Sequence, residues 1–323
     1  MPHRWAIALI LLAMIGPCAA DCGTLKLLAS VRMQPLGSGP LMLVPVRIDG
    51  VAERFLFDSG GSLSQLMPAA AKDLQLASQP AKVRLYDIYG NSTARQVTVA
   101  RLAIGDLETR DLTLWIAPTR QGDDFRWDFF RRPRWRPHGG IDGVLAPDLL
   151  GDYDIELDFA DNTLKFLSQD HCEGRVIYWR AANMAVVPMQ FRNLQISVAA
   201  VLDGHALTAL LDTGSPRSTV SLDTAQDVFH LMPGAGLSRT GRLGTTDQPV
   251  YSLRLHQLSF DGVRVDNPVF DVIPDLMRPK SQAADAASQV ALPSMLLGMD
   301  ILRKLHLYIA FGEGKIYVTE ASR

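Results

Sequence analysis

Two short motifs hold the residues of this chain that could act on a substrate. They read Asp-Ser-Gly at residues 58–60 and Asp-Thr-Gly at residues 212–214. In each, the aspartate follows an apolar run, which predicts a carboxyl group at the end of a buried strand. The glycine permits a tight loop, and the hydroxyl can bind backbone groups within it. A carboxyl group held in this way is a candidate general acid or base.

The two motifs belong to an internal repeat. Residues 44–66 read VPVRIDGVAERFLFDSGGSLSQL, and residues 199–220 read AAVLDGHALTALLDTGSPRSTV. In both copies an alternating strand enters an Asp-Gly turn and a second apolar strand follows, which predicts a β-hairpin. The turn aspartate precedes the motif aspartate by nine residues in each copy. Two matched motifs are strong evidence for a paired site, whereas one alone is weak.

The correspondence continues downstream and predicts the elements that must position the motifs. Residues 102–118 match 258–274, and residues 144–150 match 296–302. In each copy a pair of strands follows the second of these segments. Short strands between turns, with brief helices expected only over 68–76 and 222–231, predict a mostly β architecture. Two copies of one β unit predict two pseudo-symmetric lobes.

The composition is that of an ordinary globular protein. The chain has 323 residues, of which 47% are hydrophobic and 20% are charged. These values exclude a disordered or highly charged chain. The 32 basic and 34 acidic residues give a net charge of −2, so the overall charge offers nothing to a nucleic acid. We therefore expect no nucleic-acid partner.

The first 20 residues are expected to be a secretory signal peptide. An apolar run over residues 5–15 is too short to span a bilayer, and small residues precede a cleavage point after Ala20. An uncleaved membrane anchor and a lipoprotein are the alternatives, and Pro17 before Cys18 disfavours the second. We expect residues 21–175 to form an N-terminal lobe and residues 176–323 a C-terminal lobe. No membrane span is expected after cleavage.

Cleavage would change the number of cysteines in the mature chain. Cys18 would leave with the signal peptide, so Cys22 and Cys172 would remain. An even pair in an oxidising compartment predicts a disulfide that ties the mature N-terminus to the middle of the chain. The alternative is two free thiols.

The repeated motifs resemble those of the aspartic proteases. In that family, Asp-Ser/Thr-Gly is followed some 85–90 positions later by two apolar residues and a glycine. Residues 296–298 (Leu-Leu-Gly) fit this pattern fully, and residues 144–146 (Val-Leu-Ala) fit with alanine in place of glycine. The resemblance covers roughly residues 41–320. It implies two fused retropepsin-like units, that is, two acid-protease-like β-barrel lobes with the active site between them.

The resemblance also implies a mechanism and a set of site residues. Asp58 and Asp212 would share one proton, because two adjacent carboxylates cannot both ionise cheaply. One would activate a water molecule, and the other would protonate the scissile carbonyl oxygen. No metal and no cofactor are required. The supporting residues of the active-site loops would be Ser59, Gly60, Thr213, Gly214 and Ser215.

A flap over the substrate is a further expectation from the resemblance. Tyr89 and Gly90 lie about 31 residues after Asp58 and resemble the flap tip of pepsin-like enzymes. The equivalent segment of the second half, residues 243–246, has no tyrosine. We therefore expect an asymmetric pair in which the Tyr89 hairpin is the main flap. The alternative is an ordinary exposed turn.

Two positions in the first half depart from the family pattern. Family members usually carry Ser or Thr directly after the motif glycine, and its hydroxyl binds the catalytic carboxylate. Ser215 fits this pattern, but Gly61 does not. Asp58 would then be held less firmly unless Ser62 substitutes. Ala146 is the second departure, and we expect the strand crossing behind the loop to tolerate it.

Several other features receive a structural interpretation. Residues 120–136 are rich in arginine and aromatic residues, and we interpret them as an inserted loop, with a role in the cleft as the alternative. Alternating acids over residues 152–158 predict one solvated strand face rather than a metal site. Asp148 and Asp300 are expected to cap the short helices that follow them. No histidine cluster suggests a metal ligand set.

The sequence therefore predicts a secreted or periplasmic aspartic endopeptidase that is a monomer. Its partner would be a peptide or protein substrate, bound in an extended conformation by strand-like pairing. The alternative is a catalytically weak or inactive peptide-binding or regulatory protein on the same fold. Gly61 and Ala146 favour that alternative, and the retention of both aspartates opposes it.

Overall fold

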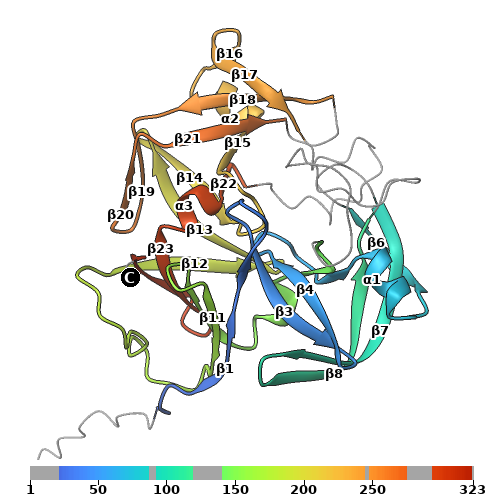
Figure 1. Cartoon of the computed structure of the whole chain (residues 1–323). Coiled ribbons are helices and arrows are strands. Elements are labelled where there is room, and N and C mark those ends of the chain that lie inside the picture. Colours follow the sequence, from blue (N-terminus) through green and yellow to red (C-terminus); the bar gives the residue numbers. More distant parts are fainter. Residues whose placement is uncertain (1–21, 87–91, 119–139, 244–246, 275–292, 322–323) are drawn as a thin grey trace, which may run out of the picture.

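The chain folds into two lobes of β-strands that share one sheet (Figure 1). The structure is a computed structural model, and it describes residues 22–86, 92–118, 140–243, 247–274 and 293–321. In Figure 1 the N-terminal lobe is blue to teal and the C-terminal lobe is yellow to orange. The prediction of a mostly β fold with two pseudo-symmetric lobes is confirmed.

The first half contains most of the N-terminal lobe and three strands of the shared sheet. Its elements are β1 (Leu27–Arg32), β2 (Gln34–Pro35), β3 (Met42–Ile48), β4 (Val51–Phe57), β5 (Gln65–Leu66), α1 (Pro68–Asp73), β6 (Gln79–Tyr86), β7 (Ser92–Ile104), β8 (Leu107–Ile116), β9 (Gly143–Leu145), the 3₁₀-helix η1 (Pro147–Leu149), β10 (Asp154–Asp158) and β11 (Thr163–Leu167).

The second half repeats this order. Its elements are β12 (Ala185–Arg192), β13 (Gln195–Leu202), β14 (His205–Leu211), β15 (Thr219–Ser221), α2 (Leu222–Asp227), β16 (Met232–Pro233), β17 (Gly236–Arg242), β18 (Pro249–Arg254), β19 (Gln257–Phe260), β20 (Val263–Asp266), β21 (Val269–Ile273), β22 (Met295–Leu297), α3 (Met299–Leu302), β23 (Leu305–Ala310) and β24 (Lys315–Glu320). No helix among the described residues is long and apolar enough to cross a bilayer.

Six strands of the first half close into a barrel. They pair in the order β3, β4, β9, β5, β8 and β7, and β7 returns to β3 through Ile48 and Leu102. Closure removes the unpaired edges of this part of the sheet. Inward-facing side chains such as Phe55 and Val97 are completely buried and fill the barrel. This apolar interior supplies the hydrophobic free energy that stabilises the lobe.

The second half forms the equivalent ring with one interruption. β13, β14, β22, β15, β21 and β18 pair in that order, and β19 returns to β13. The strand that corresponds to β7 is thus divided into β18 and β19, with Leu255 and His256 between them. β7 itself is a continuous strand of 13 residues.

The predicted hairpins are present in both halves. Asp49 and Gly50 both have positive φ (50° and 89°), as do Asp203 and Gly204 (46° and 86°). Positive φ at both central residues is the signature of a type I′ turn, whose twist matches that of the flanking strands. The Asp-Gly pairs therefore join β3 to β4 and β13 to β14 as the sequence predicts.

A six-stranded antiparallel sheet joins the two lobes. Its order is β1, β11, β10, β23, β24 and β12, so three strands come from each half of the chain. The halves meet where β10 pairs with β23, through Ile155 with Ile309 and Leu157 with Leu307. β1 lies ahead of the first hairpin and forms one edge of this sheet, against β11.

The prediction that the acidic residues of β10 form a solvated face is wrong. The side chains of Asp154 and Glu156 are only 1% exposed. Glu156 accepts hydrogen bonds from Lys165 of β11 (2.8 Å) and lies 3.1 Å from the His306 ring of β23. A charged group can be buried when it is paired and hydrogen-bonded, and strands from both halves supply those partners here. Among the described residues no cluster could hold a metal ion.

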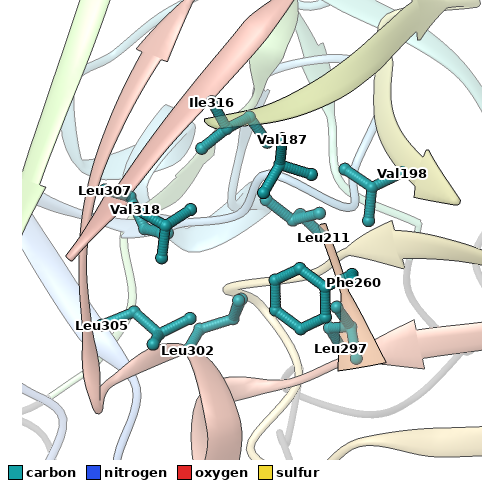
Figure 2. Close-up of a pocket in the computed structure, with 10 residues that line it drawn as sticks. All are labelled: Val187, Val198, Leu211, Phe260, Leu297, Leu302, Leu305, Leu307, Ile316 and Val318. Atoms are coloured by element: carbon teal, nitrogen blue, oxygen red, sulfur yellow. The ribbon is translucent and has the colours of Figure 1, made fainter. Parts of the chain in front are cut away.

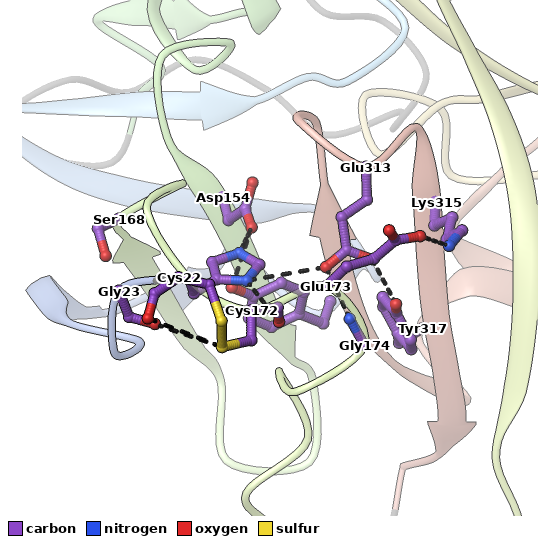
Figure 3. Close-up of polar contacts among 12 residues, drawn as sticks. Cys22, Gly23, Asp154, Ser168, Cys172, Glu173, Gly174, Glu313, Lys315 and Tyr317 are labelled. Carbon is purple, nitrogen blue, oxygen red and sulfur yellow. Dashed lines mark hydrogen bonds and ion pairs between the residues drawn. A yellow bond between two sulfur atoms is a disulfide. The ribbon is translucent and has the colours of Figure 1, made fainter. Parts of the chain in front are cut away.

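The predicted disulfide between Cys22 and Cys172 is confirmed (Figure 3). It ties the N-terminus of the described chain to the segment that follows β11. Beside it, the His171 ring lies 2.6 Å from the Asp154 carboxylate and 3.7 Å from that of Glu313. Glu313 lies in the turn between β23 and β24, so this cluster links the disulfide-bonded segment to the second half of the chain.

A small apolar cavity lies in the second half (Figure 2). Its volume is about 10 Å³, and it is lined by Val187, Val198, Leu211, Phe260, Leu297, Leu302, Leu305, Leu307, Ile316 and Val318. A space of this size is at the limit for one water molecule, and an apolar lining offers that molecule no partner. The cavity is therefore a packing feature of the core.

Candidate active site

Each motif aspartate stands directly after the second strand of its hairpin. The N–H of Asp58 donates to the carbonyl of Leu145 (3.0 Å), and that of Asp212 donates to the carbonyl of Leu297 (2.9 Å). The acceptors belong to β9 and β22, which run between the two sides of each loop: β9 pairs with β4 and β5, and β22 pairs with β14 and β15. The expected crossing strand is thus present in both halves, including the half that carries Ala146.

The two loops are locked together by the hydroxyl residues of the motifs. The N–H of Ser59 donates to Thr213 Oγ1 (2.9 Å), and the N–H of Thr213 donates to Ser59 Oγ (3.1 Å). Each hydroxyl in turn donates across the interface, Ser59 to the carbonyl of Leu211 (2.8 Å) and Thr213 to that of Phe57 (2.9 Å). All four bonds are buried, so each lobe satisfies polar groups of the other.

This lock brings the two carboxyl groups into contact. A Cβ atom added to Gly60 would lie 2.5 Å from Cγ of Asp212, and one added to Gly214 would lie 2.5 Å from Cγ of Asp58. Each carboxyl group therefore lies against the glycine of the opposite motif, and no larger residue fits there. The two carboxyl groups are hydrogen-bonded to each other, and both aspartates are half-buried.

The backbone of each loop also binds its own carboxylate. Asp58 Oδ1 accepts from the N–H groups of Gly60 (3.0 Å) and Gly61 (2.8 Å), whereas Asp212 Oδ1 accepts from the N–H of Gly214 (2.9 Å). The expected bond from the Ser215 hydroxyl to Asp212 is not observed, because that hydroxyl donates to the carbonyl of Arg217 (2.7 Å).

The environment raises the pKa of both carboxyl groups by different amounts. Burial is the main cause of the raised pKa of Asp58, and the N–H groups of Gly61 and Gly60 oppose it. Burial and the neighbouring charge of Asp58 raise the pKa of Asp212 well above its usual range. Two adjacent carboxyl groups titrate as a pair. The two aspartates therefore share one proton between them, as expected for two carboxyl groups in contact.

The two departures from the family pattern are neighbours in space. A Cβ atom at Gly61 would lie 3.0 Å from Asp58 Oδ2 and 3.6 Å from the methyl carbon of Ala146. In the other half, a Cβ atom at Gly298 would lie 2.4 Å from the backbone of Arg217, so only glycine fits. In the first half, the larger residue Ala146 behind the loop therefore lies next to the smaller residue Gly61 within the loop. Among the described contacts, Ser62 makes no hydrogen bond to Asp58.

A second layer of hydrogen bonds supports each loop. Asp148 Oδ1 accepts from the hydroxyl of Ser64 (2.6 Å), and Asp300 Oδ1 accepts from the hydroxyl of Ser218 (2.7 Å). Each serine hydroxyl also accepts from the backbone N–H of the crossing strand's next residue. The prediction that these aspartates cap short helices is wrong, because η1 and α3 have no side-chain cap. The serines were not singled out in the sequence, although their equivalent places in the repeat could have revealed them.

The predicted flap lies outside the described residues. Tyr89 and Gly90 fall within residues 87–91, and most of the corresponding segment of the second half falls within residues 244–246. The arginine-rich segment 120–136 and the proposed signal peptide, residues 1–20, also lie outside them. The flap, the role of the arginine-rich segment and the signal peptide stay predictions.

Comparison with known families agrees with this architecture. A family model described as aspartyl protease matches residues 44–145 and 198–301, once in each half. Each match begins in the first strand of a hairpin and extends through the crossing strand. The two matches together cover more than half of the chain. The protein therefore belongs to the aspartyl protease family.

A solved structure was also found to be similar. The crystal structure of basic 7S globulin from soybean aligns with 92% of this chain and 96% of that chain, with 10% sequence identity and a TM-score of 0.47. A search of curated proteins found no match.

Proposed function

We propose that this protein is an aspartic endopeptidase that hydrolyses peptide bonds with a water molecule activated by Asp58 and Asp212. The observation that carries the proposal is the contact between the two half-buried carboxyl groups, each of which lies against the glycine of the opposite motif, where burial raises the pKa of both. Such a pair supplies a base and an acid at the same point. Family membership supports the same reaction.

In the proposed reaction one member of the pair is ionised and the other is protonated, and we assign the carboxylate to Asp58, whose Oδ1 accepts two backbone N–H bonds. Asp58, as the carboxylate, takes a proton from a water molecule whose oxygen attacks the scissile carbonyl carbon. Asp212 gives its proton to the carbonyl oxygen, and a tetrahedral diol results. The diol then collapses: Asp58 passes its proton to the leaving nitrogen, the C–N bond breaks, and Asp212 regains a proton from a diol hydroxyl. Every proton returns to its starting place, and no metal or covalent intermediate takes part.

The cellular setting is part of the proposal. The disulfide between Cys22 and Cys172 is compatible with an oxidising compartment, and we propose that the protein is secreted or periplasmic. We propose that it acts as a monomer, because one chain supplies both aspartates. Its substrate would be an extended peptide or an unfolded protein. Ser59, Gly60, Thr213, Gly214 and Ser215 would support the active-site loops, as argued from their places in the sequence and the bonds above.

The test is hydrolysis of an unfolded protein substrate by the mature chain between pH 3 and 7, with the single variants Asp58→Asn and Asp212→Asn alongside. Both variants should retain the fold and lose at least about 1,000-fold in kcat/KM, since each removes an acid–base group. Pepstatin should inhibit the wild type. Equal activity in the variants would refute the paired mechanism. Peptide binding without cleavage at any pH would instead support an inactive binding protein on this fold.

A further inference from the structure

One peptide group connects the active-site pair to a side chain that the mechanism does not use. The carbonyl oxygen of Gly60 accepts a hydrogen bond from Gln195 Nε2 (3.3 Å). The N–H of Gly61, which belongs to the same peptide group, donates to Asp58 Oδ1 (2.8 Å). The amide of Gln195 and the carboxylate of Asp58 thus bind opposite ends of one peptide plane.

Gln195 reaches this peptide from the other half of the chain. It is the first residue of β13, is half-buried, and lies 135 positions from its acceptor. The equivalent position in the first half is Leu41, which lies 154 residues earlier and is 1% exposed. Leucine has no hydrogen-bond donor, so the second active-site loop receives no matching bond. The interaction is therefore present on one side of an otherwise symmetric site.

The second loop also differs at the peptide group itself. The N–H of Ser215, equivalent to that of Gly61, is shared between the carboxyl group of Asp212 and its main-chain oxygen, which lies 3.3 Å away. Asp58 Oδ1 instead receives two backbone N–H groups, one of them from a peptide whose carbonyl is also bonded. Hydrogen bonds in such a chain polarise one another and strengthen the last member.

We infer that Gln195 is a positioning residue that, through the Gly60–Gly61 peptide, holds Asp58 as the ionised member of the pair and leaves the proton on Asp212. The inference rests on the proposed function and extends it to a residue outside both motifs. Gln195 acts through the peptide and not on the substrate.

The other carboxyl group is the charge that acts on each aspartate of the pair. Burial and the charge of Asp58 raise the pKa of Asp212, whereas burial raises the pKa of Asp58 and the N–H groups of Gly61 and Gly60 oppose it. Among the residues that the structure describes, the donors on the Asp58 side are neutral amides: the Gly61 N–H and, behind it, the side chain of Gln195.

The experiment compares Gln195→Leu, which reproduces Leu41 of the other half, with Gln190→Leu, the same change at an exposed position on β12. Loss of a donor to a carboxylate raises the pKa of that carboxylate. In Gln195→Leu the acid limb of the kcat/KM profile should therefore move about 0.5–1 pH unit toward higher pH, the equivalent of one lost hydrogen bond. kcat should fall about 10-fold with little change in KM. Gln190→Leu should match the wild type.

The variant Gln195→Glu tests whether the side chain at position 195 acts as a hydrogen-bond donor or only through packing. Its protonated carboxyl group can donate to the Gly60 carbonyl, whereas its carboxylate cannot. The variant should approach wild-type activity at the acid end of the profile and fall below it as the glutamate ionises. A uniform loss of activity with an unchanged profile in both variants would overturn the inference, because packing alone would explain it.

An infrared titration of the full chain keeps this test independent of turnover. The difference between wild type and Asp58→Asn reports the first ionisation of the pair, and its midpoint should rise in Gln195→Leu. If the wild type cleaves nothing but this midpoint moves, the proposed protease function fails and the role of Gln195 stands. If the midpoint is the same with and without Gln195, the role of Gln195 is refuted whatever the activity.

Discussion

The two halves of the molecule have the same framework and different chemistry. Both contain an Asp-Gly hairpin, a crossing strand, a motif hydroxyl that reaches into the other lobe, and a serine–aspartate pair behind the loop. The differences concentrate around the carboxyl groups, where Gly61, Ala146 and Gln195 stand against Ser215, Gly298 and Leu41. Symmetry therefore builds the site, and a few differences between the halves change how each carboxyl group is held.

The strongest test of the shared framework is an added methyl group at either motif glycine. In Gly60→Ala and Gly214→Ala the new Cβ would lie 2.5 Å from the opposite aspartate's Cγ, so the carboxyl groups must separate. Since displacements of about 1 Å can cost about 100-fold in rate, each variant should lose at least that much in kcat/KM. Similar losses in the two variants would show that the contact is symmetric.

Gly241→Ala is the matched control for these variants. An added Cβ at Gly241 meets nothing within 4 Å, and its φ is not positive. It should have the activity and the thermal unfolding curve of the wild type. Wild-type activity in either motif variant would contradict the close approach of the two carboxyl groups.

The next largest effect is expected at the lock between the loops. Ser59→Ala removes the donor to the carbonyl of Leu211 and the acceptor for the N–H of Thr213, and leaves both groups buried. Each unsatisfied group costs about 1–3 kcal/mol, so the free energy of unfolding should fall by about 2–6 kcal/mol in urea titration. Thr213→Ala removes the equivalent bonds and should have a similar cost.

Conservative exchanges and a double variant sharpen this comparison. Ser59→Thr and Thr213→Ser keep a hydroxyl in each loop and should cost far less than the alanine variants. The double alanine variant should cost less than the sum of the two single variants, because the residues share their bonds. Strict additivity would show that the two loops are stabilised independently.

The framework was predictable because its motifs occur twice in the sequence, once in each half. Paired Asp-Gly turns, apolar strands and motif aspartates recur at matched spacing, and the structure confirms the hairpins, the crossing strands and the disulfide. The motifs predict that the hydroxyls of Ser59 and Thr213 bind their own loops, whereas the structure shows that they bind the opposite loop. Because the pattern occurs twice, it identifies Asp58 and Asp212 as equivalent positions. That equivalence was enough to predict that the two aspartates lie together.

The features that were missed depend on contacts between the halves. Alternating acids on β10 indicate a solvated face only if no partner covers them, and the partners Lys165 and His306 lie on separate strands. Gln195 is an ordinary glutamine in the sequence, and its acceptor lies 135 positions away.

A smaller effect on stability is expected beside the six-stranded sheet that joins the lobes, where His171 is paired with two acidic residues. Burial opposes the charge of His171, yet its bonds to Asp154 and to the Cys172 carbonyl, with the charge of Glu313, raise its pKa overall. A raised histidine pKa stabilises the fold fully below the unfolded value of about 6.5, and that stability is lost as pH rises through the folded pKa. His171→Gln should therefore lower the free energy of unfolding most below pH 6.5.

The difference between His171→Gln and wild type should shrink at higher pH, as measured by urea unfolding in non-reducing buffer. His230→Asn is the control, because His230 is exposed and has a positive φ (55°) that suits asparagine. It should leave the pH dependence unchanged. A constant difference between His171→Gln and wild type at all pH values would show that the imidazole contributes by packing and not by its charge.

The pairing of β10 with β23 has a consequence for the molecule as a polypeptide. A cut between the halves would leave each fragment with a row of free N–H and C=O groups along a largely buried strand. Such edges bind other strands and promote aggregation. The halves are thus complementary fragments of one sheet, and neither is expected to remain in solution for long without a partner that offers the missing edge.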